Sequence, residues 1–203
     1  TLGHQSQNAV KIHDLIFDLD AQLVGNVLGQ FHIGAHVLLV AGLLGMKPDD
    51  MRIPDSFEIA AAEGMEFTLA EKEIKGAHPN TAQIILEAEG AETMKIEAFS
   101  IGGGRIRVSK LDGIDVSFSG ESNTLIVRNI DQPGCITEVA ASLSDEDINI
   151  ATMQVFRDKR GGCAVMVVET DQVVSREALD RLEGKEGIVN VTFLNVNGSI
   201  EEK

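Results

Sequence analysis

Two short polar stretches of the chain carry residue types that can bind a small carboxylate. The first is His78-Pro79-Asn80-Thr81, and the second is Ser100-Ile101-Gly102-Gly103-Gly104. Together they offer an imidazole, a carboxamide, hydroxyl groups and, around the three glycines, backbone N–H groups without a bulky side chain beside them. These donors suit a small carboxylate. The alternative interpretation is an ordinary turn and a glycine-rich hairpin.

Each polar stretch borders a segment with the pattern of a β-strand. Residues 83–86 follow the first stretch, and residues 94–99, in which apolar and charged side chains alternate, lead into the second. Alternation with a period of two predicts a strand with one buried face. We therefore expect both polar stretches at one edge of a sheet.

The segment before these strands has helical apolar spacing. Apolar residues recur at steps of three and four over residues 7–30, which predicts an amphipathic helix. A second, largely buried helix is expected over residues 31–45. Ser56 has the type and position of a helix cap, for a short helix that reaches residue 64. With the strands, these helices predict an α+β N-terminal domain.

The last third of the chain predicts a second domain. Apolar patterns with periods of two and 3.6 follow one another between residues 124 and 196, in the order strand, helix, strand, strand, helix, strand. Ser175 is expected to cap the second helix. The order βαββαβ is that of a ferredoxin-like sandwich. A polar segment of small residues precedes it, so we place the domains at residues 1–120 and 123–203.

The charge and composition exclude several functions. The chain has 203 residues, no Trp or Tyr, and a formal net charge of −15 at pH 7. This charge repels nucleic acid and anionic membranes, and no basic cluster is present to contact phosphates. The longest apolar run, residues 37–46, is shorter than the roughly 18 residues that span a membrane. We expect a cytoplasmic protein that binds neither nucleic acid nor membrane.

Cysteines and histidines do not form a metal-binding motif. Cys135 and Cys163 are far apart in sequence, so they cannot hold an iron–sulfur cluster or a zinc ion without other ligands. We expect both to be structural, with Cys163 in the core. His32 and His36 are four residues apart and would share a helix face, but Ile33 stands where a zincin motif requires Glu. No metal site is predicted in this chain.

The two polar stretches and their spacing resemble the beta subunit of bacterial iron–sulfur-dependent L-serine dehydratase (L-serine ammonia-lyase). Two further segments are similar to that family: Val-Ala-Gly-Leu-Leu-Gly at residues 40–45 and Ser-Phe-Glu-Ile-Ala at residues 56–60. The last third of the chain resembles an ACT domain. The resemblance extends over about residues 37–203, and it implies an allosteric-substrate-binding-like α+β domain followed by an ACT domain.

The resemblance implies a carbon–oxygen lyase of amino-acid metabolism and gluconeogenesis that converts L-serine to pyruvate and ammonia. It implies that a cysteine-rich alpha subunit holds a [4Fe–4S] cluster, whose iron acts as a Lewis acid on the serine hydroxyl. This chain would not be active alone. It would contribute His78, Asn80, Thr81, Ser100 and Gly102–Gly104 to a substrate or effector site, and it would dimerise through the ACT domain.

The ACT resemblance also implies a second ligand site. Gly134, in the turn Asp131-Gln132-Pro133-Gly134, would let an amino acid such as L-serine approach a helix N-terminus, where free N–H groups favour a carboxylate. Asn129 and Asp131 are candidate effector-binding residues, and Asn149 would come from a symmetry-related copy. The alternative is that the turn is only a turn and that the ACT domain only dimerises.

The chain departs from the family in its histidine stretches. The family's Ser-Ser-Ser-His-Thr is represented by residues 1–5, which retain only His4, and Gly-His-Gly-Thr-Asp by residues 32–36, which keep the Gly and shift the His by one position. A side chain displaced by one residue points elsewhere, so His4 and His36 are weak catalytic candidates, and no catalytic base is assigned. The alternative function is a non-catalytic serine sensor that resembles the regulatory end of D-3-phosphoglycerate dehydrogenase.

Overall fold

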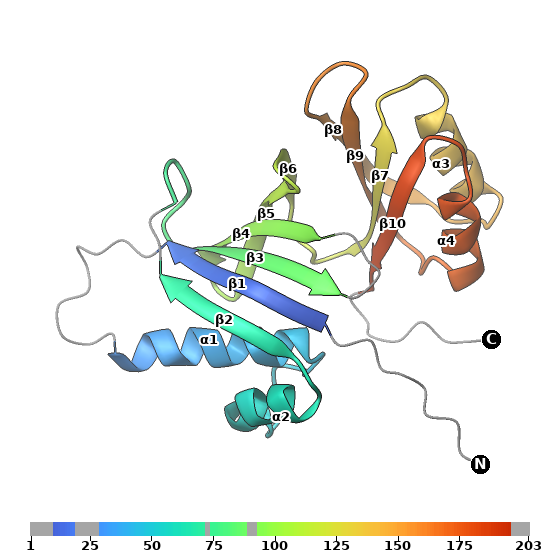
Figure 1. Cartoon of the computed structure of the whole chain (residues 1–203). Coiled ribbons are helices and arrows are strands. Elements are labelled where there is room, and N and C mark those ends of the chain that lie inside the picture. Colours follow the sequence, from blue (N-terminus) through green and yellow to red (C-terminus); the bar gives the residue numbers. More distant parts are fainter. Residues whose placement is uncertain (1–9, 19–28, 72–73, 89–92, 196–203) are drawn as a thin grey trace, which may run out of the picture. The chain divides into compact units, whose positions relative to one another are not determined.

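The computed structural model describes residues 10–18, 29–71, 74–88 and 93–195 (Figure 1). The chain divides into two compact units, Thr1–Phe99 and Ser100–Lys203, and each is described by itself. The elements, in chain order, are β1 (Val10–Asp18), α1 (Gly29–Leu43), the 3-10 helix η2 (Ile53–Asp55), α2 (Ser56–Ala62), β2 (Glu66–Glu71), β3 (Thr81–Ala88), β4 (Met94–Gly102), β5 (Arg105–Leu111), β6 (Ile114–Phe118), β7 (Asn123–Ile130), α3 (Cys135–Ser144), β8 (Ile150–Arg157), β9 (Cys163–Thr170), α4 (Arg176–Glu183) and β10 (Ile188–Leu194).

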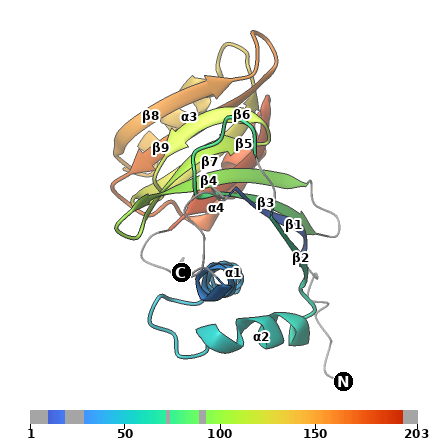
Figure 2. The ribbon, with the colours of Figure 1, turned by 90° about the vertical axis from the view of Figure 1, so that its left-hand side faces the viewer.

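The first unit is a sheet with helices on one face. Its strands lie in the order β2-β1-β3-β4, with β1 parallel to β2 and antiparallel to β3. Helices α1 and α2 lie on the same side of these strands (Figure 2). The core between the helices and the sheet is built around Val40 of α1 and Ala60 of α2, both fully buried. The expected α+β architecture is confirmed for this part of the chain.

The amphipathic helix predicted over residues 7–30 is wrong, because residues 10–18 form strand β1 and residues 19–28 lie outside the described residues. The pairing of β1 with β3 shifts register between Ile12 and Asp14. Such a β-bulge adds one residue to the strand, which turns a spacing of two into a spacing of three. Ile12 and Leu15 therefore show helical spacing in a segment that is extended.

The role predicted for Ser56 is also wrong. Asp55 is the N-cap residue of α2, and Ser56 is the first residue inside the helix. The Ser56 side chain is fully buried, and its hydroxyl donates a hydrogen bond of 3.1 Å to the carbonyl of Val37 in α1. Ser56 thus ties α2 to α1 instead of capping its own helix.

Replacing Ser56 with alanine is expected to lower the free energy of unfolding by about 0.5–1.5 kcal/mol, because the hydrogen bond from its buried hydroxyl to α1 is lost. Urea unfolding followed by circular dichroism measures this loss. Thr137→Ala, on the exposed surface of α3, is the control and should change stability by less than about 0.5 kcal/mol. Equal stabilities of the two variants would show that the Ser56 bond does not stabilise the α1–α2 packing.

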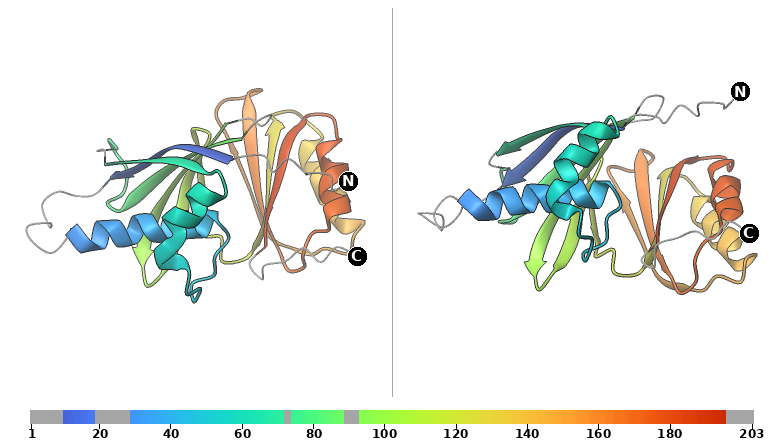
Figure 3. Two further views of the ribbon diagram at one scale, coloured as in Figure 1. Left: turned by 60° about the horizontal axis from the view of Figure 1, so that its bottom comes forward. Right: turned by 90° about the horizontal axis from the view of Figure 1, so that it is seen from below.

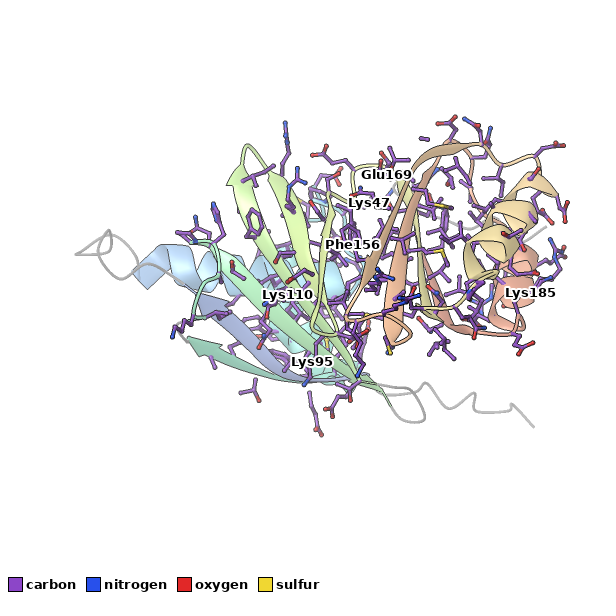
Figure 4. The ribbon with its side chains drawn as sticks, turned by 90° about the horizontal axis from the view of Figure 1, so that it is seen from above. Lys47, Lys95, Lys110, Phe156, Glu169 and Lys185 are labelled. Atoms are coloured by element: carbon purple, nitrogen blue, oxygen red, sulfur yellow. The ribbon has the colours of Figure 1, made fainter. Side chains whose placement is uncertain are left out.

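The second unit contains the predicted βαββαβ domain. Its sheet has the strand order β10-β7-β9-β8, with every pair antiparallel, and α3 and α4 cover one face (Figure 3). Ser175 caps α4 as predicted, since its hydroxyl accepts a 3.1 Å bond from the N–H of Ala178. Lys185, which follows α4 (Figure 4), pairs with Glu138 of α3 at 2.9 Å. The helix-facing core consists of Leu125, Val127, Cys135, Val139, Leu143, Ile148, Met166, Val168, Val174, Ala178, Leu179, Leu182 and Val191.

The two cysteines differ in their surroundings. Cys135 is buried at the start of α3, as expected of a structural residue, whereas Cys163, at the start of β9, is exposed. The prediction that Cys163 lies in the core is therefore wrong, because it falls at the first position of the strand, beside the β8–β9 loop. No helix in the described ranges is long and apolar enough to cross a membrane.

Candidate functional site

The first polar stretch, His78 to Thr81, forms a constrained turn at the start of β3. Asn80 adopts a positive φ of 67°, and the buried hydroxyl of Thr81 donates to the carbonyl of His78 at 2.5 Å. The His78 ring stacks on Phe99, with a centroid distance of 4.5 Å and an interplanar angle of 21°. Its Nδ1 donates to the carbonyl of Pro79, which leaves Nε2 as the ring nitrogen for a ligand.

The second polar stretch ends β4 and turns through three glycines. Gly102, Gly103 and Gly104 have φ values of 86°, 63° and 75°, which residues with a Cβ rarely adopt. A Cβ at any of the three would meet no atom within 4 Å, so the glycines are required by backbone conformation and not by packing. The hydroxyl of Ser100 accepts a 3.3 Å bond from the N–H of Gly102, and the whole stretch is exposed.

The strand register shows where the first stretch lies. Thr81, its last residue, pairs with Phe99 across β3 and β4. Phe99 is also the residue on which His78 stacks, and it directly precedes Ser100 in the chain. The His78–Thr81 turn thus lies beside Phe99, the last residue of the first compact unit. The binding role of both stretches stays a prediction.

The turn between β7 and α3 is held by a network around Asp131. Its Oδ2 accepts hydrogen bonds from the N–H of Gly161 at 2.9 Å and from Nη1 of Arg157 at 3.1 Å. The bond from Gly161, together with the bond from Arg157, lowers the pKa of the Asp131 carboxyl below its usual value. Asp131 therefore connects this turn to the β8–β9 loop and to the end of β8.

Asn129 is a buried residue with an unpaired acceptor. It is 4% exposed, and its Nδ2 donates to the carbonyl of Ile130 at 2.7 Å, which fixes the orientation of the amide. Its Oδ1 is buried and has no hydrogen-bond partner among the described residues. Gly134, with a φ of 102°, is the N-cap of α3 and makes no side-chain cap. The start of α3 therefore keeps N–H donors near the strand that carries a buried acceptor.

Asn149 lies at the other end of β8. Its Nδ2 donates to Oδ2 of Asp171 at 2.6 Å, and its N–H donates to Oε1 of Gln172 at 2.7 Å. Asn149 directly precedes β8, whereas Arg157, the partner of Asp131, ends it. At about 3.3 Å per residue, the two ends are roughly 25 Å apart. One chain therefore brings Asn129, Asp131 and Gly134 to one region but leaves Asn149 outside it.

Arg157 was not predicted as a site residue from the sequence. Its side chain is 56% exposed and pairs with Asp131, so it places a positive charge beside the turn before α3. The only available signal was a basic residue at the end of a strand that begins beside Asn149. That pattern is common on solvated strands and does not single the residue out.

The histidines outside the first polar stretch add no described site. His4 and the side chain of His32 lie outside the described residues, while His36 is half-buried on α1 and engaged in an interaction. No group of three or more His, Cys, Asp or Glu side chains in the described ranges could hold a metal ion.

The Asp131 network predicts a pH dependence of stability. Because the pKa of Asp131 is lowered in the folded chain, its contribution is present above its usual value of about 4 and is lost as the pH falls through the lowered pKa. Asp131→Asn should therefore unfold at lower urea concentration at pH 7 and lose less stability than the native chain between pH 7 and pH 3. Asp145→Asn, at an exposed position after α3, is the control. Parallel pH profiles for the native chain and Asp131→Asn would contradict the network.

The chain is similar to one family model and to several known proteins. A family model for the ACT domain matches residues 123–187. The protein named "Probable L-serine dehydratase, beta chain" from Bacillus subtilis (strain 168) is 34% identical over 78% of this chain and 72% of its own length. "L-serine dehydratase, beta chain" from Peptoniphilus asaccharolyticus is 28% identical over 80% of this chain and 74% of its own length. "D-3-phosphoglycerate dehydrogenase" from Methanocaldococcus jannaschii is 37% identical, but only over 44% of this chain and 17% of that protein.

Proposed function

Because the chain belongs to the family of L-serine dehydratase beta chains, we propose that it is the beta subunit of an enzyme that converts L-serine to pyruvate and ammonia. The observation that carries the proposal is the 34% identity over 78% of this chain and 72% of its relative. In this proposal the chain is not active alone and works in the cytoplasm with a cysteine-rich alpha subunit.

The described residues do not fit an iron–sulfur cluster. Cys135 is buried, and its Sγ–H donates a hydrogen bond of 3.5 Å to the carbonyl of Ile130. Cys163 is exposed at the start of β9. Neither cysteine belongs to a metal-binding group in the part of the chain that is described. The [4Fe–4S] cluster of the proposed enzyme is therefore assigned to the alpha subunit, and no step of the reaction is derived through it.

The proposed role of the two polar stretches is to bind and orient the carboxylate of L-serine. Nε2 of His78 and the carboxamide of Asn80 lie on an exposed turn whose shape is fixed by the Thr81 bond and the Phe99 stack. Because Nδ1 donates to the carbonyl of Pro79, Nε2 donates to a carboxylate in the imidazolium form of the ring. The backbone N–H groups of Gly103 and Gly104 are exposed in a turn without packed side chains. Preformed donors of this kind bind a carboxylate without a cost for ordering the turn.

The proposed role of the ACT domain is to dimerise and to bind an amino-acid effector. β8 lies at the edge of its sheet, where a second copy can add an antiparallel strand. Two-fold pairing of β8 with its copy places the start of one strand opposite the end of the other. Asn149 would then approach Asp131 and Arg157 of the second copy, whereas within one chain the length of β8 separates these residues.

Each group of this seam suits one part of an α-amino acid. The N-terminus of α3, capped by Gly134 without a side chain, favours the carboxylate. The unpaired Oδ1 of Asn129 and the carboxylate of Asp131 favour the ammonium group. The effector proposed for this site is L-serine.

Complex formation with the alpha subunit tests the subunit assignment. The chain is co-expressed anaerobically with a cysteine-rich alpha chain of L-serine dehydratase, and the mixture is separated by size-exclusion chromatography. We expect one peak that contains both chains and the brown absorbance of a cluster. Separate elution of the two proteins under anaerobic conditions would contradict the assignment.

A second candidate function is a serine sensor without an enzymatic partner. The similarity to D-3-phosphoglycerate dehydrogenase, 37% identity over 44% of this chain, favours a regulatory role for the ACT part. This similarity covers only 17% of that protein, whereas the beta-chain similarity extends over most of both proteins. Binding of L-serine by a chain that forms no complex with the cysteine-rich protein would favour the sensor.

A further inference from the structure

The ACT sheet is buried on both faces, although its helices cover only one. Along β9, Met166 and Val168 face the helices, and the alternate residues Val165 and Val167 are 1% and 0% exposed on the opposite face. Ile126 of β7, on that same face, is 9% exposed. An additional element of the second unit must therefore cover this face.

The β5–β6 hairpin is that element. β6 contacts both β8 and β9, and the hairpin belongs to the same compact unit as the ACT domain. Alternate residues of β6 are buried, and they extend the apolar layer under the ACT sheet. The buried apolar residues of the hairpin are Val108, Leu111, Ile114, Val116 and Phe118.

Polar contacts tie the hairpin to the ACT domain at two points and to the segment that precedes this domain at a third. At its turn, Oδ2 of Asp112 pairs with Nε of Arg128 in β7 at 3.4 Å, and these side chains are 19% and 25% exposed. The carbonyl of Ser117 in β6 accepts a bond from Nε2 of Gln154 in β8, at 3.5 Å. Arg105, the first residue after the three glycines, pairs with Glu121 in the segment before β7, at 3.3 Å.

The two contacts with the ACT domain involve strands that carry or adjoin the proposed effector residues. Arg128 is the neighbour of Asn129, and the two side chains point to opposite faces of β7. Gln154 lies on β8 between Asn149, which precedes the strand, and Arg157, which holds Asp131. A ligand that shifts Asn129 or either end of β8 would therefore also move Arg128 and Gln154, which contact the hairpin.

We propose that the ACT domain positions the Ser100–Gly104 turn through the β5–β6 hairpin, with the Asp112–Arg128 ion pair as the main connection. The turn has no packing of its own, since a Cβ on Gly102, Gly103 or Gly104 would touch nothing. Its geometry is therefore set by the strands on either side, β4 up to Gly102 and β5 from Arg105, and the second of these belongs to the hairpin. The regulatory consequence rests on the proposed function: an effector in the ACT site changes the turn that is proposed to bind L-serine.

Hydrogen exchange on the chain of residues 1–203 tests the connection. In Arg128→Gln, amides of the segment 100–111 should exchange several-fold faster than in the native chain, while the 78–86 segment of the other unit is unchanged. Asp112→Asn should have the same effect, since Asn tolerates the positive φ of 48° at this position. Arg176→Gln removes an exposed ion pair with Asp180 on α4 and is the matched control. Native-like exchange of the 100–111 segment in both hairpin variants would overturn the proposal.

A second arm adds L-serine as the probe. We expect slower exchange in segments 129–137 and 149–157 and, in the native chain only, a change in segment 100–105. Protection of the ACT segments with no response at 100–105 would overturn the regulatory part. If no segment responds to L-serine, the proposed effector site fails, while the comparison of Arg128→Gln with the native chain still decides whether the hairpin positions the turn.

Discussion

Replacing Asn129 with leucine is expected to abolish the stabilisation that L-serine gives the chain, while the unliganded protein stays as stable as the native one to within about 1 kcal/mol. Leucine has nearly the shape of asparagine, and it removes an Oδ1 acceptor that is buried without a partner. Removing an unsatisfied buried group offsets the loss of the bond to Ile130. At a ligand concentration of about 100 Kd, binding adds roughly 2.7 kcal/mol to the native chain, all of which the variant should lose.

Thermal unfolding with and without L-serine measures this difference, and D-serine serves as the ligand control. Asn190→Leu, which replaces a half-buried asparagine on β10, is the matched protein control and should keep the native response. Full L-serine stabilisation of Asn129→Leu would contradict the assignment of Asn129 to the effector site.

Loss of the His78 imidazole is expected to lower kcat/KM for L-serine by about ten- to one-hundred-fold in the complex of the two subunits. A hydrogen bond to a charged group contributes about 1.5–3 kcal/mol, and each 1.4 kcal/mol corresponds to a factor of ten. His78→Phe is the informative variant, because a phenyl ring can keep the stack on Phe99 but has no Nε2. His78→Ala removes both the stack and the ring nitrogen.

The two His78 variants separate binding from structure. If His78 contacts the substrate carboxylate, both variants should lose activity to a similar extent, with His78→Phe retaining native stability. If the ring only packs on Phe99, His78→Phe should be as active as the native protein. That second result would remove His78 from the site.

The sequence predicted the ACT part of the fold well, because local pattern and final structure agree there. Its strands and helices alternate at the expected places, Ser175 caps α4, and Val139 and Leu143 of α3 lie in the core, although Ile136 is exposed. The first unit was harder to predict. In β1 a bulge between Ile12 and Asp14 gives a strand the spacing of a helix, and only its pairing with β2 and β3 identifies it.

The candidate sites show a similar division. The composition of the His78–Thr81 turn and its place before a strand could be predicted, but the Phe99 stack could not, because it depends on the register of β3 with β4. The pairing of Arg157 with Asp131 joins residues 26 positions apart, so it requires the fold. The burial of β6 against the ACT sheet likewise depends on tertiary packing that no local pattern reveals.

Pyruvate formation from L-serine by purified, anaerobically prepared proteins tests whether this chain is the beta subunit of the enzyme. The chain, the cysteine-rich alpha protein and their mixture are assayed separately under identical conditions. We expect pyruvate and ammonia in equal amounts from the mixture and none from this chain alone. A mixture that forms no pyruvate, together with thermal stabilisation of this chain alone by L-serine, would contradict the subunit assignment and identify the chain as a sensor.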